Sequence, residues 1–282
     1  MTRWRSLLFV PGDNPDRIAG AHRRGADAII LDLEDAVAAP NKPAARAGMA
    51  GAAAHLAAAG CQVVVRINSR WRDIFADLEA VVVADLAAVM VPKVESLATI
   101  ETIDAILLEL EAERGLPARA IGLLALIESP LGLAIADRVV SCPRMIGLAL
   151  GTEDFCLALG VSPTPAALAL PSRQIALAAA TRGAMALAVP ISIATIKDQS
   201  AYRLACEAGA ASGVTGAICV HPDQIVIANR AFATSAKAIT DATAILDAWE
   251  LARQQGLSVI SLDGRMIDLP VVERARRILT DR

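Results

Sequence analysis

The sequence predicts an α/β fold, a TIM (β/α)8 barrel followed by a C-terminal helical and loop extension. Eight short runs rich in Val, Ile and Leu each end abruptly in polar residues, and helical patterns rich in Ala separate them. Continuous apolar runs, rather than alternating ones, are typical of parallel strands that are covered on both faces. Repeats of about 20 to 45 residues with one strand and one helix fit βα units joined by right-handed crossovers.

The apolar runs give the expected strands in chain order. They cover residues 6–12, 28–35, 62–68, 87–94, 121–129, 145–154, 189–195 and 217–222. The spacers between them carry helix signals. These are Asn14-Pro15, Asn41 and Ser96 where helices should begin, and Gly25, Gly60 and Gly115 where they should end.

A doubly wound open sheet is the alternative fold. It should show a glycine-rich phosphate turn after an early strand, but the first run ends in VPGDNP, and neither G-x-G-x-x-G nor G-x-x-x-x-G-K-[ST] occurs. The barrel is therefore favoured, with residues 1–230 as its domain. A bare barrel does not need residues 231–282, which we expect to form a C-terminal extension.

Composition excludes several classes of protein. A formal net charge of −3 and an aromatic content of 3% argue against a nucleic-acid partner. The five cysteines lie far apart without a C-x-x-C pair, which is typical of reduced thiols. Apolar stretches are interrupted before about 18 residues, and the run at residues 7–10 is too short for a signal peptide. We therefore expect a cytoplasmic protein that does not associate with membranes.

Charged and polar residues gather where the expected strands end, the face on which TIM-barrel enzymes carry their chemistry. They are Asp32, Glu34, Asp35, Arg66, Asn68, Lys93, Glu128, Glu153 and Asp154. The two-residue period of a strand places the side chain of Glu128 on the same face as those of Leu124 and Leu126. Acids this close repel one another unless a cation neutralises some of them. The strand ends carry no thiolate pair and no histidine before His221, so the site is rich in oxygen and suits Mg²⁺. Glu128 and Asp154, on successive strands, are the expected ligands.

Eight motifs, in order and nearly end to end, resemble the citrate lyase β-subunit-like proteins, a group that includes citryl-CoA, malyl-CoA and citramalyl-CoA lyases. They are RSLLFVPG, AIILDLEDAV with NKPAAR, VRIN, VPKVES, ALIESPLG, LGTEDF, GVTGAICVHPDQI and SLDGRMID. The resemblance implies a TIM barrel, a homo-oligomer (a trimer or hexamer), Mg²⁺ on Glu128 and Asp154, and substrate binding by Arg66. It further implies that the C-terminal segment covers a neighbouring subunit's active site and supplies Asp268 as a catalytic acid.

The expected function is an Mg²⁺-dependent carbon–carbon lyase that cleaves a short 3-hydroxyacyl-CoA, such as citramalyl-CoA or malyl-CoA, into acetyl-CoA and a 2-oxo acid. Arg66 would grip a carboxylate or hold the thioester oxygen as it becomes an enolate. Asp268 would exchange a proton with the acetyl carbon, and N–H groups around Thr152 and Glu153 would bind the oxo acid. Two alternatives remain: a citrate lyase β-subunit acting on an acyl-carrier partner, and a barrel without turnover that serves in binding or regulation.

Two departures from the family pattern stand out. Ser192 occupies a position near the expected seventh strand where many members carry Asp, and the helix after VPG lacks the lysines that some members use for the CoA phosphates. Lys93, Lys42 and Arg46 fit rim ion pairs as well as substrate contacts. The identity of the hydroxyacyl group does not follow from the sequence, because one methyl group is worth only about 1 to 3 kcal/mol in an apolar pocket.

Overall fold

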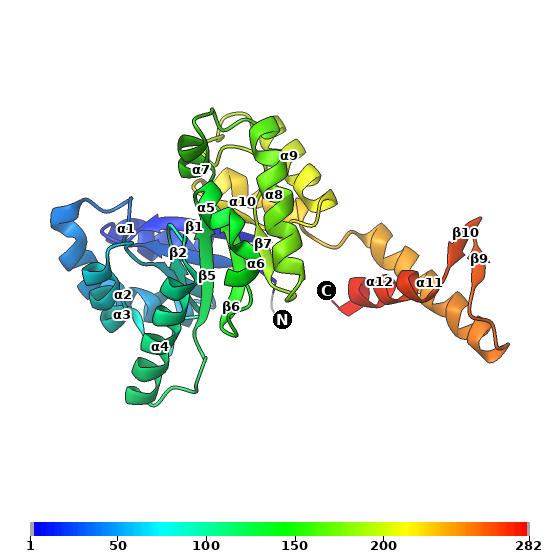
Figure 1. Ribbon diagram of the computed structural model, residues 1–282, viewed down its shortest axis with the longest axis horizontal. Coiled ribbons are helices and arrows are strands. Elements are labelled where there is room, and N and C mark those ends of the chain that lie inside the picture. The colour runs from blue at the N-terminus through cyan, green and yellow to red at the C-terminus, as the bar shows by residue number, and fades with distance from the viewer. Residues whose placement is uncertain (1–2, 281–282) are drawn as a thin grey trace. The chain divides into compact units, whose positions relative to one another are not determined.

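Eight parallel strands form a barrel in residues 3–280, the part of the chain that the computed structural model describes (Figure 1). The sheet order is β7-β6-β5-β4-β3-β2-β1-β8, and one parallel bridge, Leu187 to Gly216, joins its two edges. The predicted TIM barrel is therefore confirmed. The strands are β1 (Ser6–Pro11), β2 (Ala28–Asp32), β3 (Gln62–Arg66), β4 (Ala88–Val91), β5 (Gly122–Ile127), β6 (Met145–Leu150), β7 (Met185–Leu187) and β8 (Ala217–Cys219).

One or more helical segments follow each strand on the outside of the barrel. They are α1 (Pro15–Gly20), η1 (Ala21–Arg24), η2 (Ala39–Asn41), α2 (Lys42–Ala58), α3 (Trp71–Val81), α4 (Leu97–Glu113), α5 (Pro130–Ala134), α6 (Ala136–Val139), α7 (Thr152–Leu159), α8 (Pro165–Ala180), α9 (Gln199–Ala211) and α10 (Pro222–Ala231). Side-chain oxygens of Asn14, Ser129 and Asp198 accept backbone N–H groups in the first turns of α1, α5 and α9. These caps satisfy donors that have no partner within the helix.

Alternate strand residues face two different cores. The barrel interior is filled by one cluster that includes Ile30, Val64, Leu124 and Leu126. The residues between them belong to a larger cluster beneath the helices. Asp32, Arg66 and Glu128 each follow an interior position by two residues, so they face the same side at the carboxyl ends of their strands. The predicted direction of Glu128, together with Leu124 and Leu126, agrees with this arrangement.

The seventh strand lies earlier than predicted. β7 spans Met185–Leu187, and the expected strand at residues 189–195 is a loop that follows it. Pro190 has no N–H to donate to a sheet, which disfavours a central strand there. Val189 and Ile191 are nevertheless buried, so the apolar pattern correctly indicated burial but not extended pairing.

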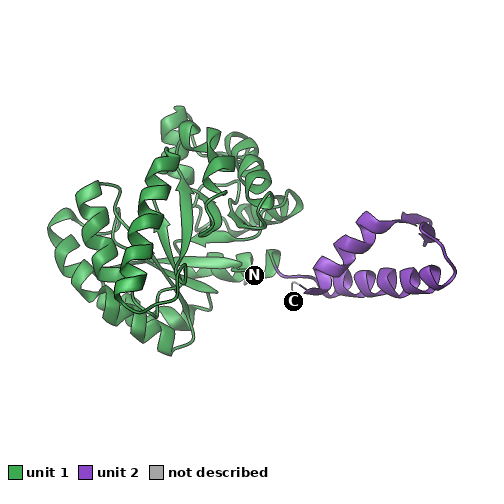
Figure 2. Ribbon diagram, turned by 60° about the horizontal axis from the view of Figure 1, so that its bottom comes forward, with its two compact units in different colours: residues 1–232 green, residues 233–282 purple. Residues whose placement is uncertain are grey.

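The chain divides into two compact units, Met1–Phe232 and Ala233–Arg282 (Figure 2). The second consists of α11 (Ala236–Gln254), an antiparallel hairpin of β9 (Ile260–Leu262) and β10 (Arg265–Ile267), and α12 (Leu269–Thr280). Asp263 and Gly264 form the hairpin loop with φ of 49° and 74°, as expected for a type I′ turn. Its core cluster of buried side chains is small and consists of Trp249, Ile267 and Val272.

Membrane insertion has no support in the helices of residues 3–280. None of them combines the length and the apolar character that a membrane span requires.

Candidate active site

Arg66, the last residue of β3, is held by a buried acid at the end of β2. Its Nε and Nη2 donate to the two carboxylate oxygens of Asp32 at 2.7 and 2.6 Å. This bidentate pair fixes the plane of the guanidinium group, whose carbon lies 4.8 Å from the centre of the Phe9 ring. Burial lowers the pKa of Arg66, but the hydrogen bonds and charge of Asp32 outweigh it and raise the pKa above its ordinary value. Arg66 is therefore a fixed cation at the barrel mouth.

Glu34 lies between Arg66 and Lys93. Its Oε2 is 3.0 Å from Nη1 of Arg66, and its Oε1 accepts a 2.9 Å hydrogen bond from Nζ of Lys93. Burial raises the pKa of Glu34, although the charges of Arg66 and Lys93 act in the opposite direction. Asp35 lies farther out, 3.6 Å from Arg66 and 3.8 Å from Lys93. Two cations thus stabilise one buried acid and one exposed acid.

Glu128 follows β5 and is buried, with 6% of its surface exposed. Its Oε2 accepts a 2.7 Å hydrogen bond from the backbone N–H of Lys93. Burial is the main cause that raises the pKa of Glu128 to about 7, and the negative charges of Glu34 and Asp154 add to it. The charge of Arg66 acts in the opposite direction but does not outweigh these causes. An acid whose ionised form is this unfavourable is suited to bind a cation.

Asp154 lies in the first turn of α7, directly after β6. Its charge acts on Glu128, so these two predicted ligands share one region of the barrel mouth. Within residues 3–280, no three His, Cys, Asp or Glu side chains form a ready-made metal site. Two carboxylates would leave most positions of a divalent ion to water and substrate oxygens, which is how Mg²⁺ is commonly held.

Thr152 and Glu153 bind the loop that follows β7. The Ser192 hydroxyl donates to Oε1 of Glu153 at 2.6 Å, and the N–H of Ile193 donates to Oγ1 of Thr152 at 3.0 Å. From the other side, the Gln224 side-chain amide donates to the carbonyl of Ile193 at 2.8 Å. The loop is therefore fixed between the ends of β6 and β8, and Ser192 serves as a hydrogen-bond donor to Glu153.

Lys42 and Arg46 belong to a hydrogen-bonded row at the rim. Nζ of Lys42 donates to Oδ1 of Asn68, while the backbone N–H and Nδ2 of Asn68 donate to Oδ2 of Asp77 at 2.8 and 2.7 Å. Nε of Arg46 donates to the other oxygen of Asp77 at 2.6 Å. Of the two interpretations that the sequence left open for Arg46, the rim ion pair is the one observed.

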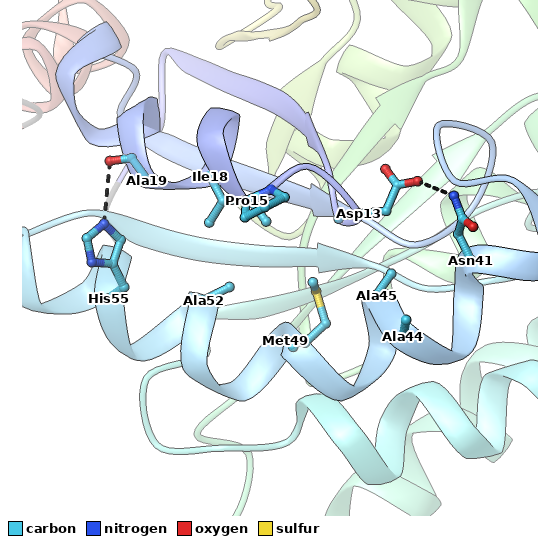
Figure 3. Close-up of a pocket in the computed structure, with 12 residues that line it drawn as sticks. Asp13, Pro15, Ile18, Ala19, Asn41, Ala44, Ala45, Met49, Ala52 and His55 are labelled. Carbon is cyan, nitrogen blue, oxygen red and sulfur yellow. Dashed lines mark hydrogen bonds between the residues drawn. The ribbon is translucent and has the colours of Figure 1, made fainter.

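A groove of about 530 Å³, here called the α1–α2 slot, runs between α1 and α2 (Figure 3). It is lined by Gly12, Asp13, Pro15, Ile18, Ala19, Asn41, Ala44, Ala45, Gly48, Met49, Ala52 and His55. Nδ2 of Asn41 donates to Asp13 at 3.0 Å near one end, and His55 lies 3.5 Å from the carbonyl of Ala19 at the other. The N–H of Gly12 donates to the carbonyl of Asp32 at 2.9 Å, so the slot begins beside the strand that carries Asp32.

Comparison with known proteins decides the family. The model described as HpcH/HpaI aldolase/citrate lyase matches residues 5–222. The chain belongs to this family. It is 35% identical to a citrate lyase subunit beta-like protein of Deinococcus radiodurans, over 98% of this chain and 96% of the relative. It is 29% identical to an L-malyl-CoA/beta-methylmalyl-CoA lyase of Rhodobacter capsulatus, over 98% and 93%.

A solved structure in the same group is similar along nearly the whole chain. It is the protein CitE from Mycobacterium tuberculosis in complex with magnesium, acetoacetate and coenzyme A. The identity is 29%, the TM-score is 0.75, and the match covers 98% of this chain and 97% of that one. The family resemblance inferred from the motifs is therefore confirmed.

Two predicted residues lie in local structural roles. Nδ1 of His221 accepts the N–H of Asp223 and caps α10. Asp268 lies between β10 and α12, where its Oδ1 accepts the N–H of Val271 at 3.3 Å. Asp268 belongs to the second unit, and its catalytic role stays a prediction of the family resemblance.

The sequence left Lys93 open between a rim ion pair and a substrate contact, and the structure shows the ion pair with Glu34. Sequence reasoning missed Gly151 and the backbone contact of Lys93 as parts of this HpcH/HpaI site. Lys93 contacts Glu34 with its side chain and Glu128 with its backbone. A Cβ on Gly151 would collide with Glu128. The available signals were that Lys93 follows Pro92 at a strand end, and that Gly151 stands immediately before TED.

Proposed function

We propose that the protein is an Mg²⁺-dependent carbon–carbon lyase that cleaves a short 3-hydroxyacyl-CoA, such as citramalyl-CoA or malyl-CoA, into acetyl-CoA and a 2-oxo acid. One observation carries the proposal: Glu128 is a buried acid with a pKa of about 7 because of burial and of the acids Glu34 and Asp154 around it. It lies at the same barrel mouth as the fixed cation Arg66. The carbon–carbon lyase class follows from membership of the aldolase/citrate lyase family.

Glu128 and Asp154 are the residues that would hold the metal. Both offer only oxygen, and the described residues around them add no histidine or thiolate, so the donor set fits Mg²⁺ better than zinc. The related CitE structure is a complex that contains magnesium. When bound, Mg²⁺ supplies positive charge that stabilises oxygen anions formed during cleavage.

Arg66 would bind the thioester oxygen or a substrate carboxylate. Cleavage turns the hydroxyl-bearing carbon into the ketone of the oxo acid and leaves an electron pair on the acetyl thioester as an enolate. A guanidinium whose plane is fixed by Asp32 is preorganised to hold that developing negative charge. The N–H groups of the first turn of α7, at Thr152 and Glu153, would donate to the oxo acid.

Asp268 would donate a proton to the acetyl carbon. The substrate hydroxyl loses one proton as it becomes a ketone, so the two proton transfers balance. We propose that Asp268 comes from a neighbouring subunit of a trimer or hexamer in the cytoplasm, with residues 231–282 covering that subunit's barrel mouth. The second unit has a small core cluster of three buried apolar side chains. This supports a role for a partner, because units of this size rarely stabilise themselves alone.

The α1–α2 slot would take the apolar arm of the thioester carrier. Its lining is mainly Ala, Gly, Pro, Ile and Met, and it begins beside Asp32. No Lys or Arg lines it, so the phosphates of CoA would pair with exposed Arg17, Arg23 or Arg24 on α1 and η1. A carrier protein would instead need its own docking surface, which is the citrate lyase β-subunit alternative.

A direct assay tests the proposal. Purified full-length protein with MgCl₂ is given citramalyl-CoA, malyl-CoA or citryl-CoA, and acetyl-CoA and the matching 2-oxo acid are quantified. Magnesium-dependent cleavage of a free thioester supports the lyase described above. Cleavage only after a charged acyl-carrier protein is supplied would establish the β-subunit alternative. A protein that cleaves neither substrate class, but remains folded, would overturn the proposal in favour of a binding role.

A further inference from the structure

We propose that Lys93 is a positioning residue that links the two halves of the site. Its backbone N–H holds Glu128, and its ammonium group holds Glu34 against Arg66. The inference rests on the proposed function, because it assigns Lys93 to the metal-binding acid and to the arginine of that reaction.

The backbone of Lys93 is bent in a way that aims its N–H at Glu128. Its φ is 51°, a left-handed conformation that few residues other than glycine adopt and that costs free energy. The next residue fixes this bend, since the N–H of Val94 donates to the carbonyl of Leu126 at 3.3 Å. A Cβ on Gly132 would lie 2.3 Å from the carbonyl oxygen of Val94, so α5 packs tightly against the same turn. A strained turn held this firmly is typical of functional sites.

The hydrogen bond from Lys93 selects which oxygen of Glu128 remains available. Oε2 of Glu128 accepts the Lys93 N–H at 2.7 Å. Oε1 is the oxygen that approaches Gly151, 2.9 Å from where a Cβ would stand. One oxygen is therefore held by the backbone, and the other is left as the ligand oxygen. Fixing a carboxylate in this way raises metal affinity without direct contact to the metal.

The side chain of Lys93 acts on the other half of the site. Nζ donates to Oε1 of Glu34 at 2.9 Å, and Oε2 of Glu34 lies 3.0 Å from Nη1 of Arg66. Without the ammonium group, the buried Glu34 would rely on Arg66 for its positive charge and would compete with the substrate for Nη1. Lys93 thus neutralises Glu34 and leaves Arg66 in the orientation set by Asp32.

The two roles can be separated with substitutions at the same position. Lys93→Met removes the ammonium but keeps an unbranched chain that tolerates the same backbone. Lys93→Val removes it too, but a β-branched residue strongly disfavours positive φ, so the N–H should leave Glu128. Lys93→Gly removes the side chain and relieves the bend. Lys93→Arg keeps the charge and serves as the conservative variant.

Isothermal titration of the full-length, metal-free protein with MgCl₂ reports on the backbone role. Lys93→Met and Lys93→Gly should bind Mg²⁺ within about threefold of wild type, whereas Lys93→Val should lose about tenfold or more in affinity. Equal affinities for the Met and Val variants would overturn the backbone role. If Lys93→Val does not fold, the Gly variant still tests it, because a loss of affinity in Lys93→Gly would contradict the proposal.

Steady-state kinetics report on the side-chain role. Lys93→Met should lower kcat/KM by about tenfold or more while Mg²⁺ affinity is kept, and Lys93→Arg should restore part of it. Wild-type kcat/KM in Lys93→Met would overturn the side-chain role. Failure of the proposed function itself looks different, because the wild-type protein would then neither bind Mg²⁺ at the site nor cleave any thioester.

Discussion

The missing side chain of Gly151 makes room for Glu128. A Cβ on Gly151 would lie 2.5 Å from Cγ of Glu128 and 2.9 Å from its Oε1. The Gly151 N–H donates to the carbonyl of Ile127 at 2.9 Å, so the backbone cannot simply move away. The end of β6 therefore fixes the position of the acid that follows β5.

Gly151→Ala should displace the Glu128 carboxylate. We expect Mg²⁺ affinity, measured by calorimetry, to fall about tenfold or more, because the ligand oxygen is moved rather than removed. Gly51→Ala is the matched control: it lies in α2 with nothing within 4 Å of the added Cβ and should leave binding unchanged. Unchanged affinity in Gly151→Ala would exclude Glu128 as a ligand in the observed orientation.

Glu128→Gln should lower activity by about 100-fold or more, because a neutral amide is a poor ligand for Mg²⁺. Its metal-free form should nevertheless unfold at a higher temperature than wild type at pH 8, since the substitution removes an unfavourable buried charge. Glu95→Gln, at an exposed acid that accepts a hydrogen bond from Ser129, is the control for both measurements. A lower melting temperature for Glu128→Gln would contradict the assigned environment.

The stability of the metal-free protein should depend on pH through Glu128. Burial raises its pKa from 4.5 to about 7 in the folded state. Between these values the folded chain binds more protons than the unfolded chain, so the free energy of unfolding decreases as pH rises, by at most about 1.4 kcal/mol per pH unit from this group. Urea unfolding from pH 4.5 to 7.5 should show this decrease, and Glu128→Gln should reduce its slope. Equal slopes would contradict the shifted pKa.

Filling the α1–α2 slot should weaken binding of the thioester carrier. Gly48→Phe places a large side chain in the slot and should raise KM for the acyl-CoA about tenfold or more, with Mg²⁺ affinity unchanged. Gly51→Phe lies in the same helix, also with open space at Cβ, but Gly51 does not line the slot. Equal KM values for the two variants would mean that the carrier binds elsewhere.

Asp268→Asn should abolish turnover while the second unit stays folded, because Asn is as good as Asp at the start of a helix. Alone, Asp268→Asn and Glu128→Gln should both be nearly inactive. Coexpressed, the two variants should recover up to about a quarter of wild-type activity if Asp268 comes from a neighbouring subunit. Some sites of the mixed oligomer then combine Glu128 from one chain with Asp268 from the other. No recovery in mixed oligomers would place Asp268 in its own subunit's site or in none.

Most of the fold could be predicted from the sequence because buried parallel strands leave a simple signal. Every expected strand except the seventh contains the observed one. The seventh failed because buried apolar residues continue past Leu187 to Val189 and Ile191, so hydrophobicity alone could not show that pairing stops at Leu187. Proline at position 190 was the available warning.

The site could be predicted only in part. Strand register places Asp32 opposite Arg66, so their convergence follows from adjacent strands that end together. The backbone contact of Lys93 with Glu128 could not be predicted, because it depends on a positive φ and on packing between residues 94 and 132. The role of Asp268 depends on a partner subunit, which the sequence of one chain does not position.

The bridge between Leu187 and Gly216 gives the barrel one weak joint. β1 and β2 pair through five residues. At the joint, Leu187 of β7 forms a single bridge with Gly216, just before β8, and the N–H groups of Thr215 and Gly216 donate to the carbonyl of Ala186. Among the barrel strands, amide hydrogens should exchange with solvent fastest along this joint, because the sheet opens locally there first. Asp32 and Arg66 lie on β2 and β3, which pair through five residues, so local opening at the joint would leave their ion pair in place.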